Sequence, residues 1–306
     1  MLALTAAAYA GVIPPPPSAA QQAPAQQPPV APAPAPQDQN RPVHSPGNAD
    51  WAPDLATARS RAAAEHKLVF YELDRKGCGD CRRMDGLLYP AFDFEALLIG
   101  MVPVKIDLDS EDGKVLGQRY TIQEAPSILI TEAGGRLAFL MQGFKNTPDF
   151  YSHVHRDLDA YRKFAVAVDA QDVPKLPAKE AFKSGSDLFA RFDFEGARAR
   201  LKRAATAPDA SPALKSSALQ GLAAAELQLG RTADARRSID QAIASAPNAE
   251  EKQRAELLRA QIPLAENKPD EALALYRQFA KDHPDSKYLD RVKGFIEKLE
   301  AGGSAK

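Results

Sequence analysis

Cys78 and Cys81 are the only cysteines among 306 residues, and they stand in the pattern C-x-x-C. An apolar run at 68–71 precedes them and helix-compatible residues follow, so the sequence predicts a strand leading into a helix that opens on the pair. At this spacing the two side chains share one helix face, close enough for a disulfide. A Cys78 thiolate would be stabilised by the free N–H groups and the dipole of the helix start. We therefore expect a dithiol that opens and closes without refolding.

Other interpretations of the pair stay open: two buried small apolar side chains, a static structural bridge, or half of a zinc site. A structural zinc ion usually has four ligands. The nearest histidines, His153 and His155, are two residues apart on a predicted helix, so their side chains diverge. The sequence favours a redox dithiol, and we expect no cofactor beyond the Cys78–Cys81 disulfide and no metal ion.

The distribution of charge argues against a nucleic-acid partner. Residues 51–165 hold 15 Lys and Arg against 17 Asp and Glu, and residues 166–306 hold 23 against 21. Neither part has the basic excess that binding to a phosphate backbone requires. We expect protein partners and no nucleic acid.

The first ten residues resemble the late apolar part of a secretory signal. Ala8-Tyr9-Ala10 has the form of an A-x-A cleavage site, although a basic stretch before it is missing. Either the true start lies upstream or this is only an alanine-rich terminus. We expect export to the periplasm or cell envelope, with a cytoplasmic protein as the alternative. No other stretch approaches the ~18 apolar residues of a membrane span, so membrane attachment is expected only if the amino terminus stays uncleaved.

Residues 11–50 form a Pro/Ala/Gln-rich segment. Of the 25 prolines in the chain, 13 lie between positions 14 and 53, with almost no large apolar residue. Such a stretch cannot bury enough surface to offset the entropy lost on ordering. The sequence therefore predicts a disordered, extended linker.

From residue 51 to 166 helix and strand patterns alternate. A hairpin is expected at 132–135, where Gly134 and Gly135 suit a tight turn. This alternation predicts an α/β fold, with a mixed central sheet and helices on both faces. The predicted helices are 54–66, 78–88, 91–98, 110–120 and about 148–166, and the predicted strands are 67–73, 101–107, 127–131 and 137–141.

Residues 51–166 resemble the thioredoxin superfamily, in particular the thioredoxin-like domains of exported bacterial proteins. The resemblance rests on Trp51 before an alanine-rich helix, on the run 66–69, on the strand 104–107, on Pro126 at the family's cis-proline position, and on Gly143 after the last strand. The family often has tryptophan before the first cysteine and proline between the two. Here Gly77 and the pair Gly79-Asp80 stand at those positions.

This resemblance implies roles for individual residues. Cys78 would attack a target disulfide and Cys81 would resolve the mixed disulfide. Glu72 would be a buried carboxylate that relays a proton to or from Cys81, although a surface glutamate is the alternative. Pro126 would be a cis-proline beside the disulfide, although an ordinary trans proline at a strand start is the alternative. The substrate would contact the residues Gly79, Asp80 and Ala125.

Residues 178–300 predict alanine-rich helix pairs. Three segments align on a small residue at Ala197, Ala235 and Ala272, each followed four residues later by a large apolar residue; prolines at 247 and 284 come 12 residues after the second and third alanines. The pattern resembles the tetratricopeptide repeat, but its spacings of 38 and 37 residues exceed the family's period of about 34. A plain array of helical hairpins is the alternative.

Together these features predict a thiol–disulfide oxidoreductase of the bacterial cell envelope. It would act on protein disulfides or dithiols, exchange electrons with a redox partner protein, and dock a further protein on the helical repeats. A chaperone or adaptor with little redox activity is the first alternative, since fusions of thioredoxin domains to tetratricopeptide repeats resemble such proteins. A purely structural interaction module is the second.

Overall fold

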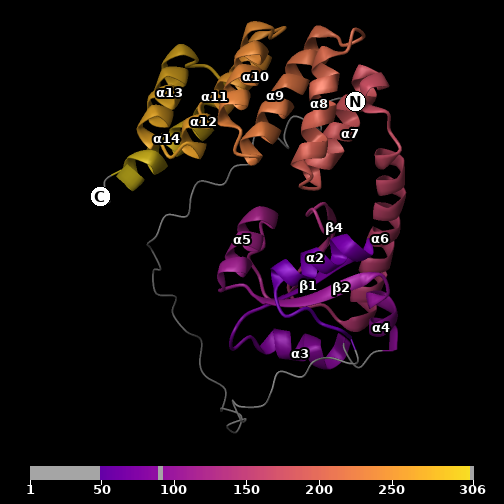
Figure 1. Cartoon of the computed structure of the whole chain (residues 1–306). Helices are drawn as coiled ribbons and strands as arrows, with labels where there is room; N and C mark the ends of the chain where they lie inside the picture. Colours follow the sequence, from indigo (N-terminus) through magenta and orange to yellow (C-terminus); the bar gives the residue numbers. More distant parts are fainter. Residues whose placement is uncertain (1–48, 89–91, 304–306) are drawn as a thin grey trace. The chain divides into compact units, whose positions relative to one another are not determined.

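The computed structural model describes residues 49–88 and 92–303 (Figure 1). The chain forms two compact units, which divide between Tyr161 and Arg162. The predicted signal segment, 1–10, and nearly all of the predicted linker, 11–50, lie outside the described residues.

The first unit contains a mixed sheet of four strands in the order β2-β1-β3-β4. Its strands are β1 (Leu68–Asp74), β2 (Met101–Asp107), β3 (Ser127–Glu132) and β4 (Leu137–Gln142). β2 runs parallel to β1, whereas β3 is antiparallel to both β1 and β4. The mixed sheet predicted from the sequence is confirmed, with each strand within one residue of its expected limits.

Helices cover both faces of the sheet (Figure 1). The helices α2 (Leu55–Glu65) and α5 (Glu111–Tyr120) lie on one face, and α3 (Gly79–Leu88) lies on the other. The remaining helices of this unit are α4 (Phe92–Leu98) and α6 (Thr147–Asp169), the second of which continues past the unit boundary. The expected start of α4 at residue 91 lies outside the described residues.

Local chemistry explains where α2 and α5 begin. Asp54 precedes α2, and its carboxylate accepts the N–H of Thr57 at 2.7 Å. Ser110 precedes α5, and its hydroxyl accepts the N–H of Gly113 at 3.0 Å. Both side chains satisfy a helix N–H that has no partner within the helix.

Alternating side chains of β1 build the cores on the two faces of the sheet. Phe70 contacts Trp51 and Phe94 edge-on, with ring centroids 6.4 and 5.8 Å apart. Tyr71 points to the opposite face, where its hydroxyl lies 3.3 Å from Nε of Arg59 on α2. Residue 72 therefore points to the same face as Phe70, the face covered by α3 and α4.

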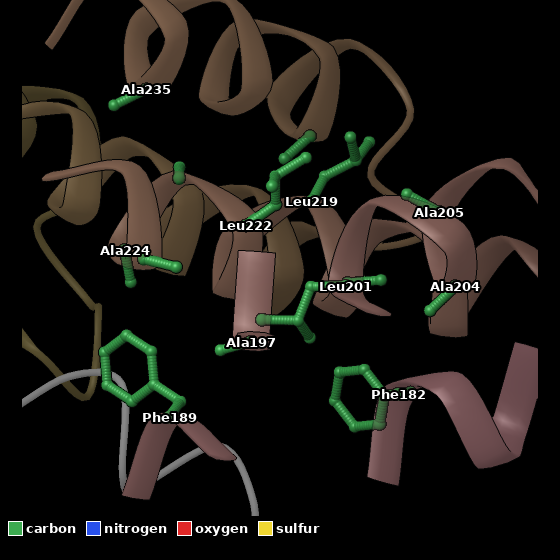
Figure 2. Packing of buried hydrophobic residues seen from close by; sticks show 14 of the residues in the cluster. Phe182, Phe189, Ala197, Leu201, Ala204, Ala205, Leu219, Leu222, Ala224 and Ala235 are labelled. Carbon is green, nitrogen blue, oxygen red and sulfur yellow. The ribbon is translucent and has the colours of Figure 1, made fainter. Parts of the chain in front are cut away.

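The second unit is an array of packed helices. α7 packs on α8 and α9 packs on α10, each pair joined by a short turn, and α14 packs on α13. The helices are α7 (Ala178–Ala190), α8 (Phe194–Thr206), α9 (Pro212–Gln228), α10 (Thr232–Ala244), α11 (Ala249–Arg259), the short α12 (Ile262–Ala265), α13 (Pro269–Asp282) and α14 (Leu289–Gly303), preceded by a 3₁₀ turn at Val173–Lys175. Figure 2 shows part of the core that α7 to α12 share, including Phe182, Leu201 and Leu222, whereas α13 and α14 pack around a separate cluster. The largely helical C-terminal region expected from the sequence is confirmed.

The three aligned alanines occupy equivalent places in this array. Ala197, Ala235 and Ala272 lie in the first turn of α8, α10 and α13, and all three are fully buried. Small side chains at these places let the two helices of a pair approach closely. The large residues four positions later are buried as well: Leu201, Ile239 and Tyr276. Among the described helices, none has the length and apolar character needed to cross a bilayer.

Candidate active site

Cys78 and Cys81 form a disulfide at the start of α3. The Sγ–Sγ distance is 2.07 Å and the Cα atoms are 5.3 Å apart. Cys78 immediately precedes the first residue of the helix, and its Sγ accepts the N–H of Cys81 at 3.0 Å. The sulfur of Cys78 therefore occupies the position where a capping side chain normally receives a helix N–H.

The two sulfur-bearing residues differ in exposure. Cys78 is half-buried, whereas Cys81 is only 4% exposed. A turn precedes Cys78 and is closed by a hydrogen bond from the Cys78 N–H to the carbonyl oxygen of Arg75 at 3.1 Å. Within this turn, Gly77 has φ of 77°. A residue with a side chain is strained in that left-handed conformation. The turn presents Cys78 to an incoming group, while Cys81 lies on the buried face of α3.

Glu72 lies in the middle of β1 and is fully buried. The sheet register places it opposite Lys105 on β2, and Lys105 Nζ lies 2.8 Å from Glu72 Oε1. The same ammonium lies 3.2 Å from Asp74 Oδ2 and 3.2 Å from Asp85 Oδ2. One lysine thus joins two carboxylates of β1 to one of α3. The alternative of a surface glutamate at position 72 is wrong.

Burial of this cluster changes its acid–base properties. Burial raises the pKa of Glu72 to about 8; the charge of Lys105 opposes the shift and Asp85 adds to it. Burial also raises the pKa of Asp74. For Lys105, burial acts to lower the pKa, but Glu72 and the two aspartates outweigh it and raise it. Glu72 can therefore gain or lose a proton near neutral pH, while Lys105 stays charged.

The cluster lies one helical turn from Cys81. Cys81, Met84, Asp85 and Leu88 follow the i, i+3, i+4, i+7 pattern of a single face of α3, and Asp85 is the residue at i+4 from Cys81. The Asp85 carboxylate accepts a hydrogen bond from the Lys105 ammonium at 3.2 Å. This face of α3 thus connects the second cysteine with the buried pair Glu72 and Lys105.

The loop before β3 has the geometry expected at Pro126. The Ala125–Pro126 peptide bond is cis, so the trans alternative is wrong. Pro126 is buried and Ala125 is half-buried. Gln142, the last residue of β4, fixes this loop: its Oε1 accepts the N–H of Gln123 at 2.9 Å, and its Nε2 donates to the carbonyl oxygen of Thr121 at 3.2 Å.

The exposed edge of the site combines α3 with the loop after β4. Gly79 and Asp80 are exposed at the start of α3. Gly143 has φ of 76°, and a Cβ atom there would lie 2.9 Å from Glu124 Oε2. The next residue is Phe144, and the guanidinium carbon of Arg83 lies 4.3 Å from the centroid of its ring. This cation–π contact links the loop directly to α3.

Sequence reasoning missed three residues of the site: Lys105, Asp85 and Phe144. A signal for Lys105 exists, because a lysine in the otherwise apolar run 101–106 needs an anionic partner if it is half-buried. Among residues 49–88 and 92–303, no group of three or more His, Cys, Asp or Glu side chains could hold a metal ion.

No protein-family model and no curated protein matches this chain. Two solved structures are similar to part of it. A thioredoxin from Thermus thermophilus has 18% identity and a TM-score of 0.32, over 35% of this chain and 85% of that one. A DsbH oxidoreductase also has 18% identity and a TM-score of 0.32, over 42% of this chain and 95% of that one. The function proposed below rests on the geometry of the Cys78–Cys81 site.

Proposed function

We propose that this protein is a thiol–disulfide oxidoreductase that exchanges electrons with protein disulfides through Cys78 and Cys81. One observation carries the proposal: a disulfide at a helix start whose first cysteine is half-exposed and whose second is buried. In such a pair a substrate sulfur reaches Cys78 first, and Cys81 reacts only with Cys78.

The reaction in the reducing direction balances as follows. The Cys78 thiolate attacks a substrate disulfide, a bond forms between Cys78 and one substrate sulfur, and the other substrate sulfur leaves and takes a proton. Cys81 then loses its proton and attacks Cys78, which releases the second substrate thiol. Two electrons pass to the substrate, and the Cys78–Cys81 disulfide remains. A partner protein with a dithiol restores the reduced form.

Glu72 is the proposed acceptor of the Cys81 proton. A general base works best when its pKa lies near the working pH, and burial brings the pKa of Glu72 to about 8. Lys105 is a positioning residue, because its contact with Glu72 at 2.8 Å and with Asp85 at 3.2 Å fixes the carboxylate beneath α3.

The loop residues would bind the substrate chain. In the proposal the half-exposed Ala125 backbone pairs with an extended substrate segment as a strand pairs with a sheet edge. Pro126 offers no N–H there, and the exposed Gly79 and Asp80 contact the segment beside Cys78.

The helical unit would dock a protein partner, as tetratricopeptide-like repeats do. Support comes from the equivalent buried positions Ala197, Ala235 and Ala272. Export to the cell envelope is proposed from residues 1–10, and the domain limits 51–166 and 178–300 stay predictions.

Reduction of insulin by the full chain, with dithiothreitol as electron source, tests the proposed activity. We expect turnover by the wild type and only the uncatalysed background with Cys78→Ser. Equal rates for the two proteins would remove the enzymatic function.

A chaperone or adaptor with little redox activity is the second candidate. It is favoured by a mainly apolar groove formed by α11, α13 and α14, which Leu257, Tyr276 and Phe295 line. Suppression of client aggregation by the double variant Cys78→Ser/Cys81→Ser, with no insulin reduction by the wild type, would select this candidate.

A further inference from the structure

Three exposed cations lie on α3 and on the loop after β4. Arg82 and Arg83 follow Cys81 in α3, and Lys145 follows Phe144; all three are exposed. We call them the basic rim. The side chains of Arg82 and Lys145 make no hydrogen bond or ion pair with any residue that the structure describes, and the contact of Arg83 is with the Phe144 ring. Their charges are free to meet a partner.

Two contacts hold the separate parts of the basic rim together. Arg83 is one turn along α3 from Gly79, and its guanidinium lies 4.3 Å from the Phe144 ring centroid. Thr147 Oγ1 donates to the carbonyl oxygen of Leu87 at 3.4 Å, which joins the start of α6 to the end of α3. Lys145 lies between these two contacts in sequence. The loop is therefore attached to α3 on both sides of Lys145.

On α3 the exposed charges are mainly positive. Asp85 turns inward to Lys105 at 3.2 Å, so Arg82 and Arg83 meet one exposed carboxylate on this helix, Asp80. Two further carboxylates lie near the loop after β4 and keep their negative charge: Asp149, which accepts from Asn146 Nδ2 at 2.8 Å, and Glu124, which lies beside Gly143. The excess of positive charge is therefore on α3.

We propose that the basic rim docks an acidic segment of the redox partner or substrate, with Asp or Glu close to the cysteine that exchanges with Cys78. The inference rests on the proposed function, since the docked chain must carry a thiol or disulfide. Stacking on Phe144 fixes the guanidinium plane of Arg83 in advance, which reduces the entropy lost when it meets a carboxylate. Complementary charge raises association rates most at low ionic strength.

A polypeptide fits this surface better than a nucleic acid. Residues 51–165 hold 15 basic against 17 acidic residues, so this part of the chain lacks the general positive field that draws a polyanion. The positive charge is local to the disulfide, where a sulfur-bearing partner must approach.

The test uses three synthetic peptides, each with one internal disulfide and the same core, flanked by Asp/Glu, by Ser/Gln, or by Lys. The full-length reduced protein is assayed for kcat/KM at about 0.02 and about 0.2 M salt, which span the range where screening becomes strong. We expect the acidic peptide to react about tenfold faster than the neutral one at low salt, with the basic peptide slowest, and the ratio to shrink at high salt.

Variants separate docking from redox chemistry. Arg83→Gln should lower the acidic-to-neutral ratio severalfold, and the triple change Arg82→Gln/Arg83→Gln/Lys145→Gln should bring it to about one, whatever happens to the rate on the neutral peptide. Lys114→Gln is the matched control, because Lys114 is exposed on α5, across the sheet from α3 (Figure 1); it should leave the ratio unchanged. Equal rates on all three peptides overturn the docking inference alone. Absence of turnover on every peptide overturns the proposed function and the inference with it.

Discussion

At the scale of single residues, the site depends on an asymmetry between two sulfurs. Cys78 is half-buried at the end of a glycine-containing turn, whereas Cys81 lies on the inner face of α3 and is only 4% exposed. The N–H of Cys81 points to the Cys78 sulfur at 3.0 Å. A negative charge on Cys78 would strengthen this hydrogen bond, so the geometry favours Cys78 as the attacking group.

This asymmetry predicts the behaviour of Cys81→Ser. The variant should form a mixed disulfide through Cys78 and accumulate it, because the residue that releases the substrate is gone. Mass spectrometry of the variant after exposure to a disulfide-containing peptide should show a one-to-one adduct. Cys78→Ser, the matched control, should accumulate far less, because Cys81 is buried. Similar adduct levels in both variants would mean that the exposures of the two sulfurs do not direct the chemistry.

A second prediction concerns Glu72 and pH. Its folded pKa of about 8 lies above the ordinary value of 4.5, so between these values the folded state holds a proton that the unfolded state releases. The free energy of unfolding should therefore fall as pH rises from 4.5 to 8. Each pKa unit corresponds to about 1.4 kcal/mol. The expected fall is of the order of a few kcal/mol, since Glu72 is buried.

Glu72→Gln should flatten this dependence, because glutamine carries no proton to lose. Urea unfolding at several pH values measures the effect. Glu111→Gln is the control, since Glu111 is an exposed glutamate in the first turn of α5; it should keep the slope of the wild type. A slope that Glu72→Gln leaves unchanged would show that another group titrates.

The residues of the site could be predicted from the sequence only where a local pattern marks them. Cys78, Cys81 and Pro126 stand in recognisable motifs, and Glu72 sits at a fixed distance before the first cysteine. Lys105 lies 33 positions after Glu72 and reaches it through the parallel register of β1 with β2, and no local pattern specifies that register. The same holds for Arg83 and Phe144, which approach only after the sheet has formed.

At the scale of elements, the period of apolar residues largely determined what the sequence could predict. Strands β1 to β4 and helices α2 and α5 fall within one or two residues of expectation, because buried runs and capping side chains such as Asp54 and Ser110 mark their ends. The sequence predicts that α6 ends near residue 166, but this helix continues to Asp169. No glycine or proline stops it earlier, since the next proline is Pro174.

The packing of α5 onto the end of β2 makes a test at this scale. A Cβ atom on Gly113 would lie 2.1 Å from the carbonyl oxygen of Asp107, so the backbone of one element must move if Gly113 becomes alanine. We expect Gly113→Ala to destabilise the protein by about 2–4 kcal/mol, measured by urea unfolding.

A matched glycine provides the control. Gly86 lies inside α3, and a Cβ atom there would meet nothing within 4 Å. Gly86→Ala should stabilise the protein by about 0.5–1 kcal/mol, because alanine favours the helix and loses less backbone entropy. Equal effects of the two substitutions would show that α5 does not need a close approach at Gly113.

At the scale of the whole molecule, the two compact units have separate cores. The core of the first surrounds a sheet, whereas that of the second is built from alanines and leucines between helices (Figure 2). The sequence predicts this change of character, because alternating strand and helix patterns give way to repeated helix pairs. The chain contains one tryptophan, Trp51, which contacts Phe70 in the first unit. Its fluorescence therefore reports on the first unit, while helical circular dichroism is weighted toward the second.

These two probes predict unfolding transitions that do not coincide, as expected for units that unfold separately. Gly113→Ala should move the fluorescence midpoint to lower urea and leave the main circular dichroism transition in place. Ala235→Leu should do the opposite, because Ala235 is fully buried where α10 begins, and extra volume in a packed core costs about 1–3 kcal/mol. If each substitution shifted both transitions equally, the two units would be one cooperative structure. In that case, a partner that binds the helices would also change the stability of the unit that holds Cys78 and Cys81. Separate transitions would mean that the properties of this disulfide depend on contacts within the first unit alone.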